Sequence, residues 1–281
     1  MLPKPMYAFV IALALGSQTQ ALKAVDFSEA DALFAERDGG RDKVQAARAA
    51  YQTLVTQSAK GSTDIIRAAA GVARSYLYEI NAYLDIKVDA QKKERKALAS
   101  DCWRKALEVI SPTNLGFETP VYWYFRANCL SRDAEVSNVL ERLANLAKLN
   151  ESFDKGLAVA GGDIYEGGGV KRVKAAVKSN PEAKGIPGGL YNPEEGLKLI
   201  DSAIEAEAYP DNAPGNLFCE NYRRKISVLF ELKRSTEAKE LAEQTIVDFE
   251  SYLLEDLIPA FIKPETVLCI KETTDLRDSI N

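Results

Sequence analysis

The sequence contains no histidine among its 281 residues. This absence excludes Ser-His-Asp and Cys-His catalysis, a histidine general base, and zinc or iron sites with histidine ligands. Basic residues are also in deficit, because 36 Lys and Arg face 41 Asp and Glu and leave a net charge of −5. A general nucleic-acid-binding protein normally carries a basic surface. We therefore expect a protein without catalytic residues, metal or cofactor that does not bind nucleic acid.

The N-terminus has the three parts of a secretory signal peptide. Lys4 supplies a positive charge, and an apolar run from Met6 to Leu15 follows it. These 10 residues are too few to span a bilayer. Thr19 and Ala21 place small residues before a cleavage site. We predict that residues 1–21 are removed on export to the periplasm; the alternative is a buried N-terminal helix.

No cysteine lies near this cleavage site, so the mature chain has no point for lipid attachment. We also expect no transmembrane segment in the mature chain. The four cysteines are even in number, which favours disulfides in an oxidising compartment. Cys102 and Cys129 lie symmetrically about a predicted helix–helix turn, which favours a Cys102–Cys129 bond and leaves Cys219 and Cys269 as the second pair. Four cysteines allow three pairings, and buried free thiols are the alternative.

Apolar residues recur at helical spacing almost throughout, and no segment shows the alternation of a strand. The pattern predicts an all-α chain in which residues 22–255 form a single helical-repeat domain. Residues 256–281 are expected to form a polar C-terminal tail that packs back on the last repeats and frays at its end. The predicted helices include residues 41–58, 63–84, 87–110, 134–157, 216–233 and 235–254.

Several helices carry small and large apolar residues at the spacing of tetratricopeptide repeats. Ala99, Trp103 and Ala106, followed by Pro112, give the best match. The repeats are longer than the usual ~34 residues, because Ala47 and Ala99 are 52 residues apart. We predict a tetratricopeptide-like solenoid of helical hairpins with degenerate, elongated repeats. A non-repetitive helical bundle is the alternative.

A glycine-rich segment, residues 156–196, interrupts this pattern. It holds ten of the 17 glycines. Gly167, Gly168 and Gly169 precede Lys171 and Arg172 at a helix start. They indicate either a close contact between helices or a site where free backbone N–H groups bind an anionic group. A nucleotide loop is disfavoured, because no Lys-Ser/Thr pair follows the glycines and no strand precedes them.

Basic and aromatic residues supply the other candidate sites. Lys171, Lys174 and Lys178 share one helical face, which is either solvated or a docking surface. Tyr76, Tyr83, Tyr122 and Tyr124 are candidates for a groove that binds an apolar ligand or a peptide, with core packing as the alternative. Together with the glycine-rich helix start, the candidate binding residues are Tyr76, Tyr83, Tyr122, Tyr124, Tyr165, Gly167, Gly168, Gly169, Lys171, Arg172 and Lys174.

The glycine-rich block resembles the T-component family that is associated with TRAP-type solute transporters. The matching residues are Tyr165-Glu166-Gly167-Gly168-Gly169, Val170 to Lys174, Pro187-Gly188-Gly189 and Glu195-Gly196-Leu197. The resemblance implies stacked helical hairpins around a cleft, sometimes in a small homo-oligomer, with a periplasmic solute-binding protein as partner. The chain departs from the family in having no lipoprotein cysteine.

These observations predict a non-enzymatic periplasmic binding or scaffold protein, in its most specific form a T-component-like accessory of solute uptake that binds an apolar or anionic ligand. A general envelope scaffold for protein assembly is the alternative. A remote third reading is a cell-wall lytic enzyme, because Glu151-Ser152 resembles the catalytic pair of helical lytic transglycosylases. The Gly-Leu-Met-Gln sequence expected downstream is missing.

Overall fold

The structure, a computed structural model, describes residues 25–186 and 190–280. Within these ranges it contains helices and no strand, which confirms the all-α prediction. The predicted signal peptide, residues 1–21, and the Pro187-Gly188-Gly189 turn lie outside the described residues. The helices are α1 Ser28–Ala35, α2 Arg41–Gln57, α3 Thr63–Tyr83, α4 Asp89–Asp101, α5 Pro112–Leu115, α6 Pro120–Glu135, α7 Val139–Ala158, α8 Tyr165–Ser179, α9 Pro193–Ile204, α10 Cys219–Glu231, α11 Ser235–Leu254 and α12 Lys263–Ser279.

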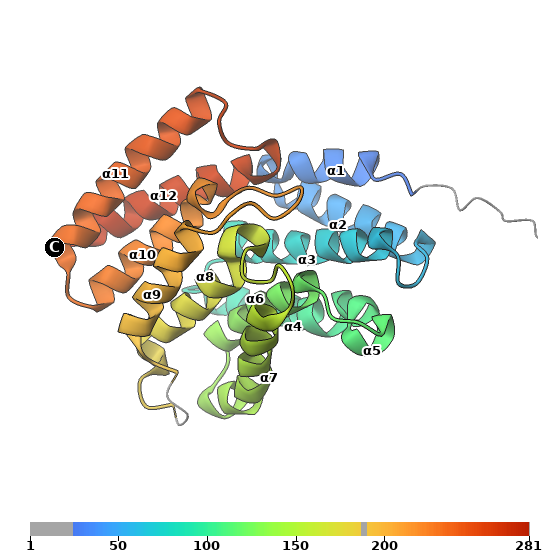
Figure 1. Ribbon diagram of the computed structural model, residues 1–281, viewed down its shortest axis with the longest axis horizontal. Helices are drawn as coiled ribbons and strands as arrows, with labels where there is room; N and C mark the ends of the chain where they lie inside the picture. The colour runs from blue at the N-terminus through green and yellow to red at the C-terminus, as the bar shows by residue number, and fades with distance from the viewer. Residues whose placement is uncertain (1–24, 187–189, 281) are drawn as a thin grey trace, which may run out of the picture.

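Helices that follow one another in the chain pack in pairs. The closest pairs are α2 with α3, α6 with α7, α8 with α9 and α10 with α11. Further contacts of α6 with α3, α4 and α8, and of α10 with α8 and α12, join the pairs to one another (Figure 1). Helix α6 therefore lies near the middle of the molecule. The regular stacking of a tetratricopeptide solenoid stays a prediction.

The helix expected over residues 134–157 is interrupted at residues 136–138, between the end of α6 and the start of α7, and two further segments differ from the expected helices. The helix expected over residues 87–110 is α-helical only as far as Asp101. A wider π-helical turn, Cys102–Ala106, follows it. The polar C-terminal end, expected to fray, instead forms helix α12, which packs against α10 and α11. Its buried residues include Thr266, Cys269 and Thr273. Polar and β-branched residues on this inner face hide the apolar periodicity from which a helix is predicted.

Helix starts follow the local sequence closely. The Ser62 side chain accepts a hydrogen bond from the Ile65 backbone N–H, 3.2 Å away, at the start of α3. The Asn192 side chain does the same for the Glu195 N–H at the start of α9. Ser and Asn are favoured here because their side-chain oxygens satisfy N–H groups that have no partner within the helix.

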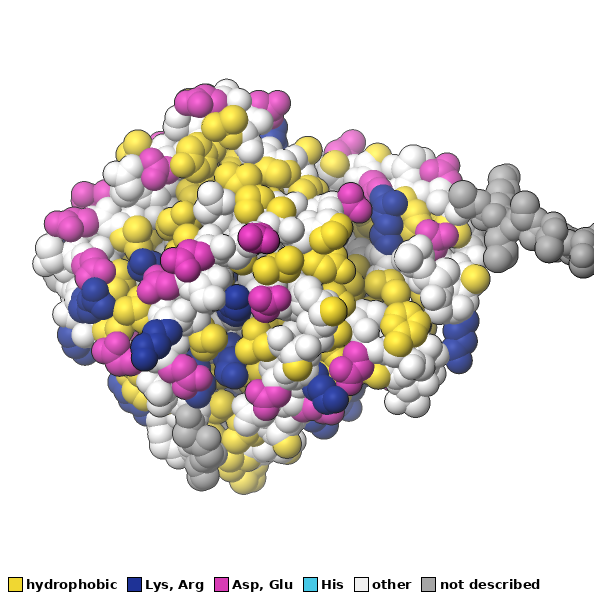
Figure 2. Space-filling view, in the orientation of Figure 1, with side chains coloured by type: hydrophobic (Ala, Val, Ile, Leu, Met, Phe, Trp, Pro, Cys, Tyr) yellow, Lys and Arg dark blue, Asp and Glu magenta, His cyan; other side chains and the backbone are white. Residues whose placement is uncertain are grey.

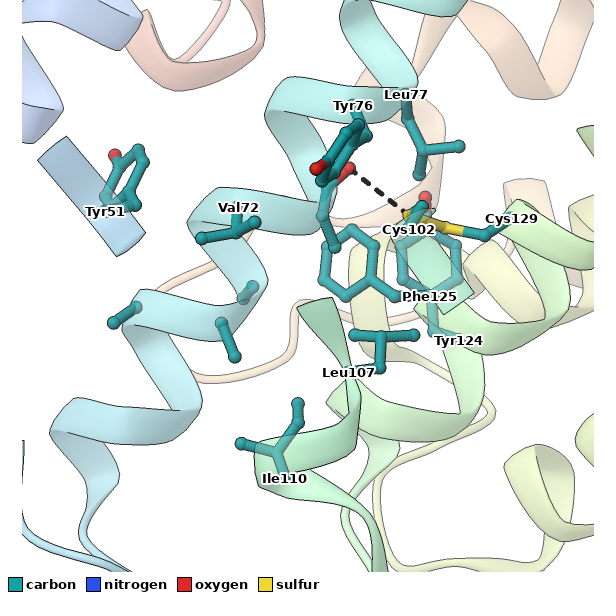
Figure 3. Close-up of a cluster of buried hydrophobic side chains, with 14 of the residues drawn as sticks. Tyr51, Val72, Tyr76, Leu77, Cys102, Leu107, Ile110, Tyr124, Phe125 and Cys129 are labelled. Atoms are coloured by element: carbon teal, nitrogen blue, oxygen red, sulfur yellow. Dashed lines mark hydrogen bonds between the residues drawn. A yellow bond between two sulfur atoms is a disulfide. The ribbon is translucent and has the colours of Figure 1, made fainter. Parts of the chain in front are cut away.

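The two disulfides join the pairs predicted from the sequence, Cys102–Cys129 and Cys219–Cys269. Cys102 and Cys129 lie beside Leu77 and Phe125 in the largest hydrophobic core cluster (Figure 3). The second disulfide connects α10 to α12 within a separate apolar cluster that includes Phe249. One bond therefore fastens the N-terminal core, and the other fastens the C-terminal helix.

A buried arginine connects the two ends of the chain. The Arg37 side chain is 0% exposed and lies over the Phe34 ring, 4.2 Å from its centre. Its guanidinium donates to the Phe34 carbonyl at 2.8 Å, to the Phe261 carbonyl at 2.6 Å and to the Glu265 carboxylate of α12. Helix α12 is thereby held against the N-terminal hairpin.

The visible surface in Figure 2 mixes acidic and basic side chains without a large area of one sign. None of the helices in the described ranges combines the length and the apolar character needed to cross a bilayer.

Candidate functional site

A cavity of about 890 Å³ lies between α3, α4, α6, α8, α10 and α12. This volume falls in the range of small-molecule sites, roughly 300–1,000 Å³. Aromatic side chains line part of the wall, but the charged residues are its main feature. Six arginines line it, namely Arg74, Arg95, Arg132, Arg172, Arg223 and Arg224.

One end of the cavity is a closed polar network around Arg172. The Arg172 guanidinium, in a residue that is 6% exposed, donates to the Asn221 side-chain oxygen at 2.9 Å and to the Glu166 carbonyl at 3.2 Å. It also contacts the Tyr124 hydroxyl at 3.4 Å. Buried donors that find several protein acceptors stabilise one arrangement of the backbone. Arg172 therefore serves the fold at this end.

Asn221 completes this network from α10. Its side-chain N–H₂ donates to the carbonyls of Gly167 at 3.0 Å and Gly215 at 2.8 Å, and lies 3.3 Å from the Ala203 carbonyl. Asn221 is 0% exposed, so its amide, and not bulk water, is the donor to these carbonyls. The amide thus holds the glycine-rich turn against the loop that precedes α10.

Glu166 and Arg74 form the neighbouring ion pair. Glu166 is buried and has a left-handed backbone with φ of 53°. Burial opposes the charge on Arg74, but the nearby Glu166 carboxylate outweighs burial and raises the pKa of Arg74. For Tyr124 burial raises the pKa, because it disfavours the charged phenolate. At neutral pH this end therefore contains a charged Arg74 guanidinium beside the neutral phenol of Tyr124.

Another part of the wall is a cluster of four arginines, which we call the arginine cluster: Arg95, Arg132, Arg223 and Arg224. Three carboxylates form ion pairs with it. Arg223 pairs with Glu220 at 2.7 Å and with Glu272 of α12 at 3.1 Å. Arg95 pairs with Glu135 at 2.9 Å, and Arg132 pairs with the same carboxylate. Asp85 also lines the cavity and attracts Arg95, so four carboxylates face the four arginines.

Arg224, like Arg132, has only one hydrogen-bond acceptor among the described residues. Its Nε–H donates to Glu220 at 2.8 Å, and no other hydrogen bond joins its side chain to the described residues. Burial, together with repulsion from Arg223, lowers the pKa of Arg224 to about 10. The side chain is thus still charged at neutral pH, but its environment does not fully compensate the charge. Glu220, although burial disfavours its charge, has its pKa lowered by Arg223 and Arg224.

Two further donors in the arginine cluster lack partners. The buried Nε atoms of Arg95 and Arg132 have no hydrogen-bond acceptor among the residues that the structure describes. Native proteins seldom leave buried donors unpaired without water or a ligand nearby. A guanidinium with free donors suits a carboxylate or phosphate, which it binds through two parallel hydrogen bonds. The cluster can therefore bind an organic anion.

The structure brings only some of the predicted binding residues to this cavity. Tyr83, Tyr124 and Arg172 line it. Tyr76 instead is buried under the Arg48 guanidinium, and Tyr122 packs edge-to-face on Trp123. The four tyrosines proposed for one groove are thus divided between the cavity and the core.

The remaining aromatic and basic candidates lie outside the cavity. The Tyr165 ring is buried between Tyr124 and Tyr209. Lys171 donates to the Ser202 hydroxyl at 3.0 Å, and Lys174 lies 3.7 Å from Asp154. Neither lysine lines the cavity of the arginine cluster. The basic helical face is therefore paired with neighbouring helices.

The three glycines make close contacts. A Cβ atom added to Gly167 would lie 2.2 Å from the Phe218 ring, and one added to Gly168 would lie 2.7 Å from the Ala203 backbone. At Gly169 the nearest atom would be on Tyr124, at 2.5 Å. The glycines thus allow α8 to approach its neighbours, which was the first of the two interpretations of this segment.

No motif in the sequence brings the four residues of the arginine cluster together. One local signal was present, because Glu220 precedes Arg223 and Arg224 by three and four residues, the spacing of ion pairs on a helix. Arg95 and Arg132 come from helices far away in the sequence, and no local pattern connects them with α10.

No known protein family matches the chain, and comparison with curated proteins and with solved structures likewise finds no match. The site is therefore interpreted from its own geometry. Among the described residues, no group of three or more Cys, Asp or Glu side chains is arranged to bind a metal ion.

Proposed function

We propose that this protein is a non-enzymatic binding protein of the bacterial periplasm whose arginine cluster binds an organic anion. The observation that carries the proposal is the incomplete pairing of Arg224 in a cavity of about 890 Å³. A purely structural arginine would resemble Arg172, which has several protein acceptors. The two disulfides are compatible with a protein that folds outside the cytoplasm.

The partner class follows from the resemblance to the T-component family. We propose an accessory of a TRAP-type uptake system that associates with a periplasmic solute-binding protein. The ligand cavity supports this role, because an uptake accessory handles small molecules, whereas a scaffold for protein assembly needs only an outer surface. Co-purification with a solute-binding protein would support the accessory role, and an outer-membrane client in its place would favour the scaffold.

The lytic-enzyme reading gains no support from the position of Glu151. Its side chain is 50% exposed, pairs with Arg126 at 2.7 Å and lies outside the arginine-lined cavity. A general acid in a glycosidase needs a sheltered carboxyl group with a raised pKa. We therefore do not propose this reaction.

Native mass spectrometry of the gently purified protein tests anion binding. The wild-type protein is expected to retain an organic anion, and Arg224→Met is expected to lose it because the guanidinium is removed while much of the side-chain volume remains. Arg234→Met is the control, since it removes the same charge from an exposed position away from the cavity. Equal retention by Arg224→Met and wild type would contradict the proposal.

A further inference from the structure

A second cavity adjoins the arginine cluster. Its volume is about 350 Å³, and it lies between α6, α7, α8 and α10, with one side chain from α12 and several from the segment between α8 and α9. Its wall is mainly apolar and includes Leu130, Leu149 and Val177.

The two cavities share four lining residues, Ser131, Glu135, Ala176 and Arg224. The incompletely paired guanidinium therefore stands at the boundary between a charged compartment and an apolar one. Two of the four shared residues, Ser131 and Ala176, are small, and the other two, Glu135 and Arg224, carry the charges of the boundary. A ligand that reaches both compartments needs an anionic end and an unbranched apolar end.

We propose that the ligand is a single-chain alkyl carboxylate whose carboxylate binds Arg224 and whose chain occupies the apolar cavity. This inference rests on the proposed function and adds the ligand class. Charge complementarity fixes the orientation: the anion stays with the arginine cluster, because moving a carboxylate into the apolar cavity would leave it without compensating charge. The apolar cavity in turn removes the chain from water.

The opposite orientation would be poorer for a second reason. Arg142 also lines the apolar cavity, but its guanidinium is already paired with Glu182 at 2.6 Å. Its Nε also donates to the Ala134 carbonyl at 2.8 Å. Arg224 thus remains the better-placed donor for the carboxylate.

The experiment is isothermal titration of the full mature protein with butanoate, octanoate and decanoate. Each buried methylene is worth about a fourfold gain in affinity. The affinity of wild type is therefore expected to rise steeply from butanoate to octanoate and to level off once the apolar cavity is filled. Equal affinities for all three would overturn the inference but leave anion binding intact. Failure of all three to bind would overturn the inference, and retention of an anion by wild type but not by Arg224→Met would still support the proposed function.

A cavity-filling variant provides the matched test. Ala134 lines only the apolar cavity, so Ala134→Leu is expected to weaken decanoate binding at least tenfold and to leave butanoate binding within twofold. Ala46→Leu is the control, because it makes the same change on the exposed face of α2. Unchanged decanoate affinity in a folded Ala134→Leu variant would contradict the inference. The chain-length series on wild type decides the matter if that variant does not fold.

Discussion

Arg172 and Arg224 line the same cavity, yet their surroundings differ. Arg172 meets acceptors from three residues, and its guanidinium joins α8 to α6 and α10. Arg224 has a single partner, Glu220, one turn earlier on its own helix. The comparison teaches that lining a cavity does not by itself leave an arginine free for a ligand. A guanidinium whose donors are saturated by protein acceptors, as at Arg172, has none left for a ligand, and our proposal for Arg224 rests on this difference.

The largest expected effect is on stability, from Arg172→Met. The substitution leaves the Asn221 oxygen and the Glu166 carbonyl without a buried donor, which is expected to cost roughly 3–5 kcal/mol. Equilibrium urea unfolding measures this loss. Arg224→Met is the matched comparison and is expected to change the free energy of unfolding by about 1 kcal/mol or less, because it also relieves repulsion with Arg223. Equal losses in the two variants would contradict the distinction.

The next-largest effect on stability is expected at Gly167, in the glycine-rich turn that Asn221 holds. At Gly167 the backbone has φ of 57°, and an added Cβ would collide with Phe218. Gly61 has a similar φ of 78° but nothing within 4 Å of the added atom. In both alanine variants the left-handed backbone is expected to lower the free energy of unfolding by roughly 1–2 kcal/mol. Gly167→Ala is expected to lose about 1–3 kcal/mol more through overpacking. Thermal unfolding compares them, and equal destabilisation would mean that the ring moves aside freely.

Acid should reduce the free energy of unfolding, because it protonates the carboxylates that pair with the arginine cluster. Despite burial, the arginines lower the pKa of both Glu220 and Glu135 in the folded state from the ordinary value of 4.5. A lowered folded pKa gives stability that is present above the unfolded value and is lost as the pH falls toward the folded value. We expect a loss of roughly 1–2 kcal/mol per carboxylate by about pH 3.

Unfolding measured between neutral pH and about pH 3 tests this dependence. Glu220→Gln should flatten the profile, since glutamine does not titrate. A variant that keeps the full wild-type slope would show that Glu220 does not contribute to it.

The smallest effect is expected at Lys171, which the sequence placed beside the anion-binding helix start. Its nearest carboxylate, Asp163, is 3.9 Å away. Lys171→Ala is expected to change the free energy of unfolding by less than about 0.5 kcal/mol. Carboxylate affinity, measured by titration calorimetry, should stay at the wild-type level. A clear loss of affinity would move the anion site from the arginine cluster back to the start of α8.

Local features of the fold were predictable from the sequence. Ser62 and Asn192 mark helix starts because their side chains cap the backbone directly. The helical class followed from apolar spacing. Helix α12 was missed because buried Thr266 and Thr273 take positions where apolar residues are expected. Cys102 lies in a π-turn, a local widening that no periodicity indicates.

The site was less predictable, because its charges come from distant parts of the chain. Arg95 and Glu135 are 40 residues apart, and Arg172 and Asn221 are 49 apart. Each residue alone resembles an ordinary surface charge on an amphipathic helix. The glycines of residues 167–169 indicate a close approach of α8, but the rings that they contact, Phe218 just before α10 and Tyr124 in α6, lie elsewhere in the chain.

The most direct test of the central claim is a crystal structure of the protein grown with decanoate. We predict the carboxylate within hydrogen-bond distance of the Arg224 guanidinium and the chain in the apolar cavity beside Leu149. Decanoate bound elsewhere on the molecule, with both cavities filled only by water, would contradict the account.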